Sequence, residues 1–518
     1  MPEMLASYVA GRWYTPPDGG VAVADAATGD PVAVVSSAGL DTRAAVDHAR
    51  AVGGPALRGL TFPERAAALK ALAAHLDSRK EAYYELSTST GATRRDSAVD
   101  IDGGIATTFA FSGVGKREMP DGHLLVDGDA VIMGKEGTFA GRHFYTPLRG
   151  AAVQINAFNF PVWGMLEKLA PAVLAGMPSI VKPATQTAYL TAAVFRDIID
   201  SGTLPEGAVQ LICGGLGDLL DHLSGQDVIA FTGSAGTAAK VRGHDAVIKR
   251  SARFNAETDS LNCSILGPDA GSDSEEFGLF VKEVALETTV KAGQKCTAIR
   301  RAFVPAAVVD DVVSALRGRL ERVVVGNPRS DTVTMGALVS LAQRDEVRGA
   351  VSALSRAAEV LVGDAERVDP VDADPQRGAF IAPIVLLCND VDRAEPHEVE
   401  AFGPVTTIIP YASADDVVDL AARGSGSLVG SVVSHDPDFV RDVVLRTAAH
   451  HGRLLVLDRD CAAESTGHGT PMPQMVHGGP GRAGGGEELG GVRAVTHFMQ
   501  RTALQGSPSA IARVLGAA

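Results

Sequence analysis

The chain has 518 residues, of which 46% are hydrophobic and 21% are charged, with a formal net charge of −15. This length predicts two or three domains, and the excess of acidic residues argues against a nucleic-acid-binding surface. The N-terminus has no basic segment followed by an apolar run, and no stretch reaches the roughly 18 apolar residues of a membrane helix. We therefore expect a cytoplasmic protein that binds neither nucleic acid nor a membrane.

The five cysteines are spread along the chain and form no Cys-x-x-Cys pair. An odd and scattered set does not make a disulfide framework, so we expect reduced thiols. The cysteines and histidines are not clustered at the spacing of zinc ligands, and we predict no metal site.

The first half of the chain alternates short apolar runs with amphipathic segments after residue 150. Strand-like runs occupy residues 151–155, 179–181, 209–212 and 228–231, and helix-like segments occupy 166–175 and 187–200. This alternation predicts βαβ units around a mainly parallel sheet.

The second half repeats the alternation between residues 260 and 470. One helix face, which includes Phe277, Phe280 and Val284, leads into a cysteine-containing loop. We also predict helices over 307–323 and 340–360 and a surface loop over 364–378. The Gly- and Pro-rich residues 468–491 are either a flexible linker or a loop packed against an active site. Residues 492–501 are strand-like and could extend a partner subunit's sheet.

Cys296 lies in a loop that Gly293 opens and Lys295 flanks. Most cysteines are buried and inert, and we interpret the other four in that way. In this loop the glycine allows a close approach of backbone and the lysine favours a thiolate, so we predict that Cys296 is a nucleophile.

A single carboxylate, Glu257, ends the strand-like segment upstream of this loop. Such a group is usually solvated or ion-paired. If it faces the thiol, it can deprotonate the water that hydrolyses a thioester, or help to form the thiolate. Partial burial would raise its pKa into a range suited to a base, and we expect a raised pKa here.

Asn159 precedes Phe160-Pro161, a sequence typical of a tight turn. Its amide, together with the backbone N–H of Cys296, could also stabilise the oxyanion that forms when a thiolate adds to an aldehyde. The two roles are compatible. A thiol, a base and this donor are the parts needed to oxidise an aldehyde through a covalent thioester.

Two strand-to-helix turns are candidates for cofactor binding. Lys182 follows one strand, at the position where open α/β sheets bind ligands, and could reach a ribose hydroxyl or a phosphate. Gly233 and Ser234 join another strand to a helix whose N-terminus would attract a pyrophosphate. No Gly-x-Gly-x-x-Gly follows a strand, so the usual dinucleotide fingerprint is absent, and such turns alone are weak evidence.

The chain resembles the aldehyde dehydrogenase family over nearly its whole length. The resemblance rests on six segments in the family's order: Asn159-Phe160-Pro161, Lys182-Pro183-Ala184, Phe231-Thr232-Gly233-Ser234, Glu257, Gly293-Gln294-Lys295-Cys296 and Glu400-Ala401-Phe402-Gly403-Pro404. It implies that Cys296 is the nucleophile, Glu257 the general base and Asn159 the oxyanion donor. It also implies that the nicotinamide end of the cofactor meets Glu400 and Phe402, and that further cofactor contacts come from Ile155, Phe158, Lys182, Thr185, Gly217, Gly233 and Ser234.

The sequence departs from the family pattern in three places. Thr185 stands where NAD-preferring relatives often carry Glu, so a 2′-phosphate would be tolerated; we predict NADP as the cofactor, with NAD possible. Glu257 is followed by Thr258-Asp259-Ser260 rather than Leu-Gly-Gly. The spacing between Glu257 and Cys296 is also longer than in most relatives.

Residues 254–262 and 501–508 are most similar to a branch of the family that acts in bacterial degradation of aromatic compounds. This branch implies an aliphatic CoA-linked semialdehyde as substrate, oxidised to the carboxylic acid. Two alternatives stay open: an acylating dehydrogenase, in which CoA resolves the thioester and no general base is needed, and a non-catalytic structural relative.

The family implies an α/β fold with a doubly wound cofactor domain, an α/β catalytic domain and a small β oligomerisation arm. We assign residues 1–130 and 149–260 to the dinucleotide-binding domain, 261–480 to the catalytic domain, and 131–148 and 490–505 to the arm. The resemblance also implies a homodimer or homotetramer.

Overall fold

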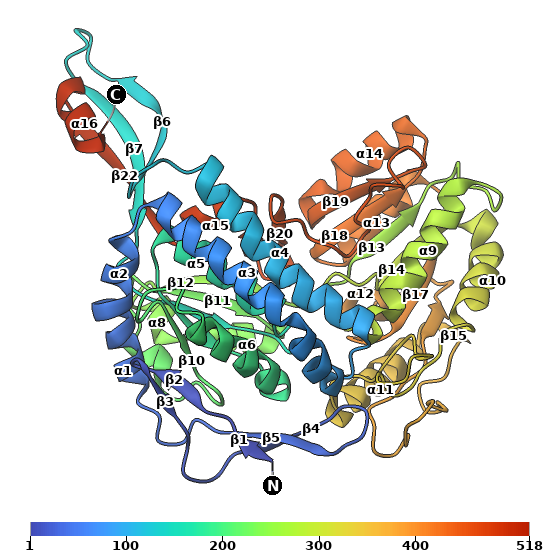
Figure 1. Ribbon diagram of the computed structural model, residues 1–518. Helices are drawn as coiled ribbons and strands as arrows, with labels where there is room; N and C mark the ends of the chain where they lie inside the picture. The colour runs from blue at the N-terminus through green and yellow to red at the C-terminus, as the bar shows by residue number, and fades with distance from the viewer. Residues whose placement is uncertain (1, 517–518) are drawn as a thin grey trace.

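Two seven-stranded sheets form most of the protein, whose computed structural model describes residues 2–516 (Figure 1). The first sheet has the order β12-β11-β8-β9-β10-β2-β3. Its first five strands are parallel, and β2 and β3 are antiparallel additions at one edge. The strands are β12 (Arg253–Glu257), β11 (Val228–Thr232), β8 (Ala152–Ile155), β9 (Ser179–Lys182), β10 (Val209–Leu211), β2 (Ser7–Val9) and β3 (Arg12–Tyr14).

Helices cover both faces of this first sheet because its strands are apolar on both sides. In β8, neighbouring residues point to opposite faces of the sheet. Ala152 belongs to the core between the sheet and four long helices, and Val153 belongs to a second core, between the sheet and two helices on the other face. The four are α3 (Phe62–Ser87), α4 (Arg94–Arg117), α5 (Trp163–Ala175) and α6 (Ala188–Asp200), and the two are α1 (Thr42–His48) and α7 (Ala235–Arg242). The sheet is therefore doubly wound, as predicted.

The second sheet has the order β15-β16-β17-β14-β13-β18-β19, and only β15 is antiparallel to its neighbour. The strands are β15 (Glu359–Val362), β16 (Ile384–Leu387), β17 (Val405–Tyr411), β14 (Arg301–Pro305), β13 (Cys263–Leu266), β18 (Ser427–Val433) and β19 (His451–Leu457). On one face lie α9 (Glu275–Thr289) and α10 (Val309–Leu320), and on the other α11 (Leu341–Leu354), α13 (Ala414–Arg423) and α14 (Pro437–Thr447).

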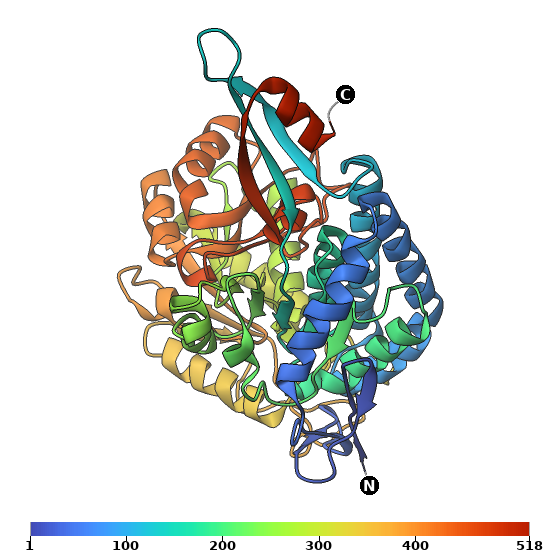
Figure 2. The ribbon, with the colours of Figure 1, turned by 90° about the vertical axis from the view of Figure 1, so that its left-hand side faces the viewer.

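A three-stranded antiparallel sheet projects from the body and carries the C-terminal helix (Figures 1 and 2). Its elements are β6 (Leu125–Ile132), β7 (Ala140–Pro147), β22 (Met499–Gly506) and α16 (Pro508–Leu515). Large apolar side chains are exposed near its tip, including Val131, Ile132 and Phe139.

Smaller elements complete the fold. They are β1 (Glu3–Met4), β4 (Val21–Ala24), β5 (Pro31–Val35), α2 (Gly54–Arg58), α8 (Asp245–Ile248), α12 (Glu395–Glu398), β20 (Val476–Gly478), β21 (Glu487–Leu489) and α15 (Val492–His497). Among the described residues, no helix is both long enough and apolar enough to cross a membrane.

Two secondary-structure predictions were wrong. The helix predicted over 340–360 ends at Leu354, and the chain continues into the edge strand β15. The strand predicted over 492–501 is a helix as far as His497, because Ala494 and Val495 pack into the core under α5, and only Met499 onward forms the strand β22. In both places an apolar run fits either structure locally, and tertiary packing decides between them.

Candidate active site

The loop that carries Cys296 begins with three left-handed residues in succession. Lys291, Ala292 and Gly293 have φ values of 54°, 49° and 67°. The N–H of Lys291 donates to Asp96 of α4 at 2.9 Å, which holds this unfavourable backbone in place. A Cβ on Gly293 would lie 2.2 Å from the carbonyl oxygen of Gly403, so the expected close approach of backbone is confirmed.

Two buried side chains fix the backbone of the Cys296 loop by donating hydrogen bonds to its carbonyl groups. Asn262 donates to the carbonyls of Cys296 and Ala298 at 2.7 and 3.0 Å. Arg300 donates to the carbonyls of Gly293 and Gly403 at 2.9 and 2.7 Å. The nucleophile loop and the segment 400–404 are thus tied to one guanidinium, a connection that the sequence pattern did not reveal.

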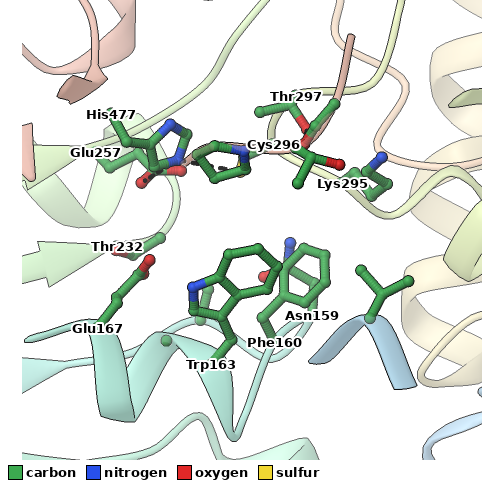
Figure 3. A pocket seen from close by; sticks show the side chains of 16 residues that line it. Asn159, Phe160, Trp163, Glu167, Thr232, Glu257, Lys295, Cys296, Thr297 and His477 are labelled. Atoms are coloured by element: carbon green, nitrogen blue, oxygen red, sulfur yellow. Dashed lines mark hydrogen bonds and ion pairs between the residues drawn. The ribbon is translucent and has the colours of Figure 1, made fainter. Parts of the chain in front are cut away.

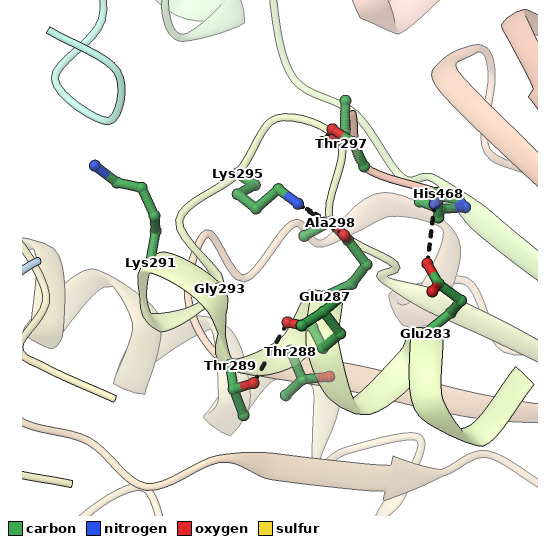
Figure 4. A network of polar contacts seen from close by, with 12 residues as sticks. Glu283, Glu287, Thr288, Thr289, Lys291, Gly293, Lys295, Thr297, Ala298 and His468 are labelled. Atoms are coloured by element: carbon green, nitrogen blue, oxygen red, sulfur yellow. Dashed lines mark hydrogen bonds and ion pairs between the residues drawn. The ribbon is translucent and has the colours of Figure 1, made fainter. Parts of the chain in front are cut away.

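Lys295 does not act as the thiolate partner that we predicted. Its ammonium is paired with Glu287 of α9 at 2.7 Å (Figure 4). Burial, followed by the negative charge of Glu257, raises the pKa of the Cys296 thiol well above its usual value, and Lys295 opposes this only weakly. A flanking positive charge in sequence therefore does not by itself produce a thiolate.

Glu257, Cys296 and His477 converge on one cavity (Figure 3). Glu257 ends β12, and its Oε2 lies 3.2 Å from Nε2 of His477. The same nitrogen lies 3.9 Å from the Sγ of Cys296. Glu257 and His477 are each no more than 4% exposed at the side chain, whereas Cys296 is half-buried.

The expected raised pKa of Glu257 is wrong. Burial alone would raise it, but the charge and hydrogen bond of His477, followed by the charge of Lys168, lower the pKa of this carboxyl below its usual range. Glu257 is therefore a carboxylate in the resting protein. Its Oε1 has no hydrogen-bond partner within residues 2–516, so one oxygen stays available to a water molecule.

His477 was missed because it lies in the Gly- and Pro-rich residues 468–491, whose role the sequence left open. The structure shows a loop packed against the site. Asn255 of β12 exchanges hydrogen bonds with the backbone of Glu487, and the N–H of Thr258 donates to Ala483. The many glycines permit this close packing: a Cβ on Gly486 would lie 2.5 Å from the carbonyl oxygen of Ala256.

A buried ion cluster lies beside Glu257 and His477. Lys168 of α5 is 2% exposed and donates to Glu167 at 3.2 Å and to Glu488 at 3.0 Å. Burial raises the pKa of Glu488 to about 7, although Lys168 opposes the shift. No sequence pattern predicted this cluster, because its members come from two distant elements, α5 and β21.

Asn159 lines the same cavity and is buried. Figure 3 shows it across the cavity from Cys296. The turn that carries it leads into α5, whose first N–H groups at Val162 and Trp163 donate to Asp100 of α4. Asp100 thus fixes the turn, and the Asn159 amide does not need to cap it. Its role as oxyanion donor stays a prediction.

A second, larger cavity adjoins the first, and Cys296, Glu257, Asn159 and Thr232 line both. The predicted cofactor residues on its wall are Ile155, Phe158, Lys182, Thr185, Gly233, Ser234, Glu400 and Phe402. Gly217 is not on this wall; it lies in the turn after β10 with a φ of 56°. The structure therefore brings together eight of the nine.

The wall of this second cavity is built by two regions of the chain. Ser234 caps α7 by accepting from the N–H of Thr237, and the N–H of Ala235 donates to Asp259. From the segment between α12 and β17, Glu400 accepts from the N–H of Ser260 at 3.0 Å, and burial raises its pKa to about 7 despite Arg300 nearby. Phe402 packs edge-on against Phe158 at 5.8 Å between ring centroids.

Comparison with known proteins assigns the family. The model of the aldehyde dehydrogenase family matches residues 13–503. The chain belongs to the aldehyde dehydrogenase family. It is an oxidoreductase, and the non-catalytic alternative is set aside. A curated relative, 3,4-dehydroadipyl-CoA semialdehyde dehydrogenase of Aromatoleum evansii, is 46% identical over 478 residues, which cover 92% of this chain and 93% of the relative.

Further matches include a shorter curated relative and two solved structures of low sequence identity. Protein MaoC of Klebsiella aerogenes is 48% identical over 183 residues, 35% of this chain and 52% of that protein. Among solved structures, a betaine aldehyde dehydrogenase mutant of Staphylococcus aureus superposes with a TM-score of 0.84 at 22% identity, covering 97% of this chain and 95% of that one. Lactaldehyde dehydrogenase of Escherichia coli gives 0.83 at 20% identity, covering 98% and 99%. These structures share the fold of this enzyme.

Proposed function

We propose that this aldehyde dehydrogenase oxidises an aliphatic CoA-linked semialdehyde, 3,4-dehydroadipyl-CoA semialdehyde or a close analogue, to the carboxylic acid with NADP. One structural observation supports the reaction type most directly: Cys296, Glu257 and Asn159 all lie where the two cavities meet. The substrate class is supported by the relative with 46% identity over 92% of the chain, whose name specifies that semialdehyde.

The three side chains fit successive steps of aldehyde oxidation. The sulfur of Cys296 adds to the aldehyde carbon, and the Asn159 amide stabilises the oxyanion of the resulting thiohemiacetal. Loss of hydride leaves a thioester on Cys296. Glu257 then takes a proton from water, which attacks the thioester and releases the acid. This order requires Glu257 to be an unprotonated carboxylate, as its lowered pKa provides.

The second cavity fits a nicotinamide dinucleotide. The hydroxyl of Thr232, which lines both cavities, has no hydrogen-bond partner in the described part of the chain. Lys182 and Ser234 would hold the phosphate and ribose groups, and Glu400 the nicotinamide ribose. The dinucleotide supplies the hydride acceptor.

The preference for NADP rests on Thr185, which lines this cavity beside Lys182. A Thr at this position leaves room for a 2′-phosphate and brings no negative charge against it. Lys182, a half-buried lysine whose pKa is lowered by desolvation, lies on the same wall. A carboxylate at position 185 would repel the phosphate and would instead accept from a 2′-hydroxyl.

We further propose that the enzyme works in the cytoplasm in the degradation of aromatic compounds, as a homodimer or homotetramer that assembles through the projecting β6-β7-β22 sheet. The exposed Val131, Ile132 and Phe139 on that sheet would be covered by a partner subunit. The domain boundaries given above follow from the same assignment.

The test compares one simple aliphatic aldehyde with a CoA-linked semialdehyde, with NADP or NAD and without free CoA, by following absorbance of the reduced nucleotide. We expect strong turnover of the CoA-linked substrate with NADP. Activity on the simple aldehyde alone would contradict the substrate assignment. Activity that appears only after free CoA is added would establish the acylating reaction instead.

A further inference from the structure

Helix α5 forms one wall of the cavity around Cys296 and places two large side chains there, one turn apart. Trp163 and Glu167 both line this cavity, and Figure 3 shows them across it from Cys296. Residues four positions apart lie on the same face of a helix. An aldehyde bound at Cys296 therefore has an indole ring and a carboxyl group close to its chain.

The indole ring is held in place by two glycines of α4. A Cβ on Gly103 would lie 2.5 Å from the ring of Trp163, and a Cβ on Gly104 would lie 2.9 Å from its Cα. Glycine inside a helix is unfavourable relative to alanine, and here the pair makes room for the ring. Phe160 packs edge-on against the indole at 5.9 Å between ring centroids. This part of the wall is therefore apolar and closely packed.

Glu167 takes no part in the proposed reaction, and its charge is only partly compensated. Its Oε1 lies 3.2 Å from the ammonium of Lys168, which also binds Glu488 at 3.0 Å. One cation is thus shared by two carboxyl groups. Lys168 is 2% exposed and does not line the cavity, whereas Glu167 does. The group that Glu167 presents to a substrate is therefore negative.

Among the described residues, no positive charge on the cavity wall is free to offset Glu167. The basic side chains that line it already have partners: His477 lies 3.2 Å from Glu257, and Lys295 lies 2.7 Å from Glu287. Burial and the charge of Glu257 are the main causes of the raised pKa of the reacting thiol, and the charge of Glu167 adds to them. The field of Glu167 therefore extends to the reacting end of the cavity and acts on any charge that the aldehyde carries.

We propose that Glu167 selects against aldehydes with a free carboxylate at the far end, so that the enzyme prefers ω-oxo acids whose acid group is masked as a neutral thioester or ester. The inference deepens the proposed function and rests on it, because the thioester of a CoA-linked semialdehyde removes the charge that Glu167 repels. Two carboxylates in an apolar cavity repel each other more strongly than in water, and the apolar wall does not solvate the second one. A neutral carbonyl avoids this repulsion.

The test compares 6-oxohexanoate, its methyl ester and hexanal, which have the same carbon chain and contain no CoA. We expect the wild-type kcat/KM for the methyl ester and for hexanal to exceed that for 6-oxohexanoate by about 100-fold or more. Glu167→Gln keeps the shape of the side chain and removes its charge, so the ratio of 6-oxohexanoate to hexanal should rise by about 10-fold or more. This ratio is the readout, because the loss of the charge also changes the reactivity of the thiol toward every aldehyde.

Glu464→Gln is the matched control, since it removes the same charge from an exposed position in the loop before the cavity-lining residues 469–471 and should leave the ratio unchanged. Equal use of 6-oxohexanoate and its methyl ester by the wild type would overturn the proposal, whether or not the variant folds. A ratio that Glu167→Gln leaves unchanged in a folded protein, as judged by thermal unfolding, would also overturn it. Neither result bears on turnover of the CoA-linked substrate, so the two proposals fail separately.

Discussion

The two cavities that meet at Cys296 are built in different ways. The second, larger cavity is called the cofactor cavity here. Its wall comes largely from the ends of neighbouring strands of one sheet, at Ile155, Lys182 and Gly233, with a smaller contribution from Glu400 and Phe402. The first cavity, called the thiol cavity here, is lined by Asn159, Glu257, Cys296 and His477, which come from four separate segments of the chain. Parallel strands bring their carboxyl ends to one edge automatically, whereas the thiol cavity depends on contact between distant parts of the chain.

The cavities also differ electrostatically. The thiol cavity encloses carboxylates and a buried lysine, so the pKa of each group depends on its neighbours. The cofactor cavity also carries charges, including Lys182 and Glu400, but Thr185 and Ser234 on its wall are neutral, and we expect these two to act through shape and hydrogen bonding. Substitutions in the first cavity should therefore change the chemistry, and substitutions in the second should change the choice of cofactor.

The largest effect is expected for Cys296→Ala, which removes the atom that forms the covalent bond. Loss of a nucleophile costs about 10⁴-fold or more in turnover. Reduced-nucleotide formation and covalent trapping of the aldehyde, followed by mass spectrometry, should both disappear. The matched control is Cys461→Ala at a partly buried thiol away from both cavities, which should keep normal turnover. Trapping that persists in Cys296→Ala would place the nucleophile elsewhere.

Glu257→Gln should separate the formation of the thioester by hydride transfer from the hydrolysis of that thioester. The amide cannot take a proton from water, so thioester hydrolysis should slow by ~10² to 10⁴-fold. We expect a burst of one reduced nucleotide per site and an acyl-enzyme that mass spectrometry detects. Unchanged steady-state turnover would remove Glu257 from the mechanism.

Asn159→Ala should reduce kcat by about 10² to 10³-fold, because one oxyanion donor is lost. The protein should keep its thermal stability, since Asp100 rather than Asn159 caps α5. A large fall in unfolding temperature would instead make Asn159 a structural residue of the turn.

The smallest effect on the chemistry is expected for Thr185→Glu, which changes only the cofactor cavity. The new carboxylate repels a 2′-phosphate, and kcat/KM for NADP should fall by about 10-fold or more, which corresponds to about 1.4 kcal/mol, while activity with NAD is kept or improved. The neighbouring Gln186→Glu is the control for added charge alone. Equal losses with both cofactors would show that Thr185 does not contact the 2′ position.

Much of the fold could be predicted from local pattern. The alternation around residues 151–231 gave the strands β8, β9, β10 and β11 to within a residue or two, because strands buried on both faces are apolar throughout. Residues 340–360 and 492–501 were mispredicted because their apolar runs suit both helix and strand, and only the neighbouring core decides.

The sequence by itself determined the family, through short contiguous segments in the family's order, and it predicted the nucleophile loop and the cofactor turns from the residues of those segments. Tertiary structure decided which charged groups lie next to one another and in which direction their pKa values shift. Lys295 forms an ion pair with Glu287, the Glu257 pKa is lowered rather than raised, and His477 stands beside both Glu257 and Cys296. A pKa depends on which charges lie within a few ångströms, and those charges come from residues up to hundreds of positions apart in the chain.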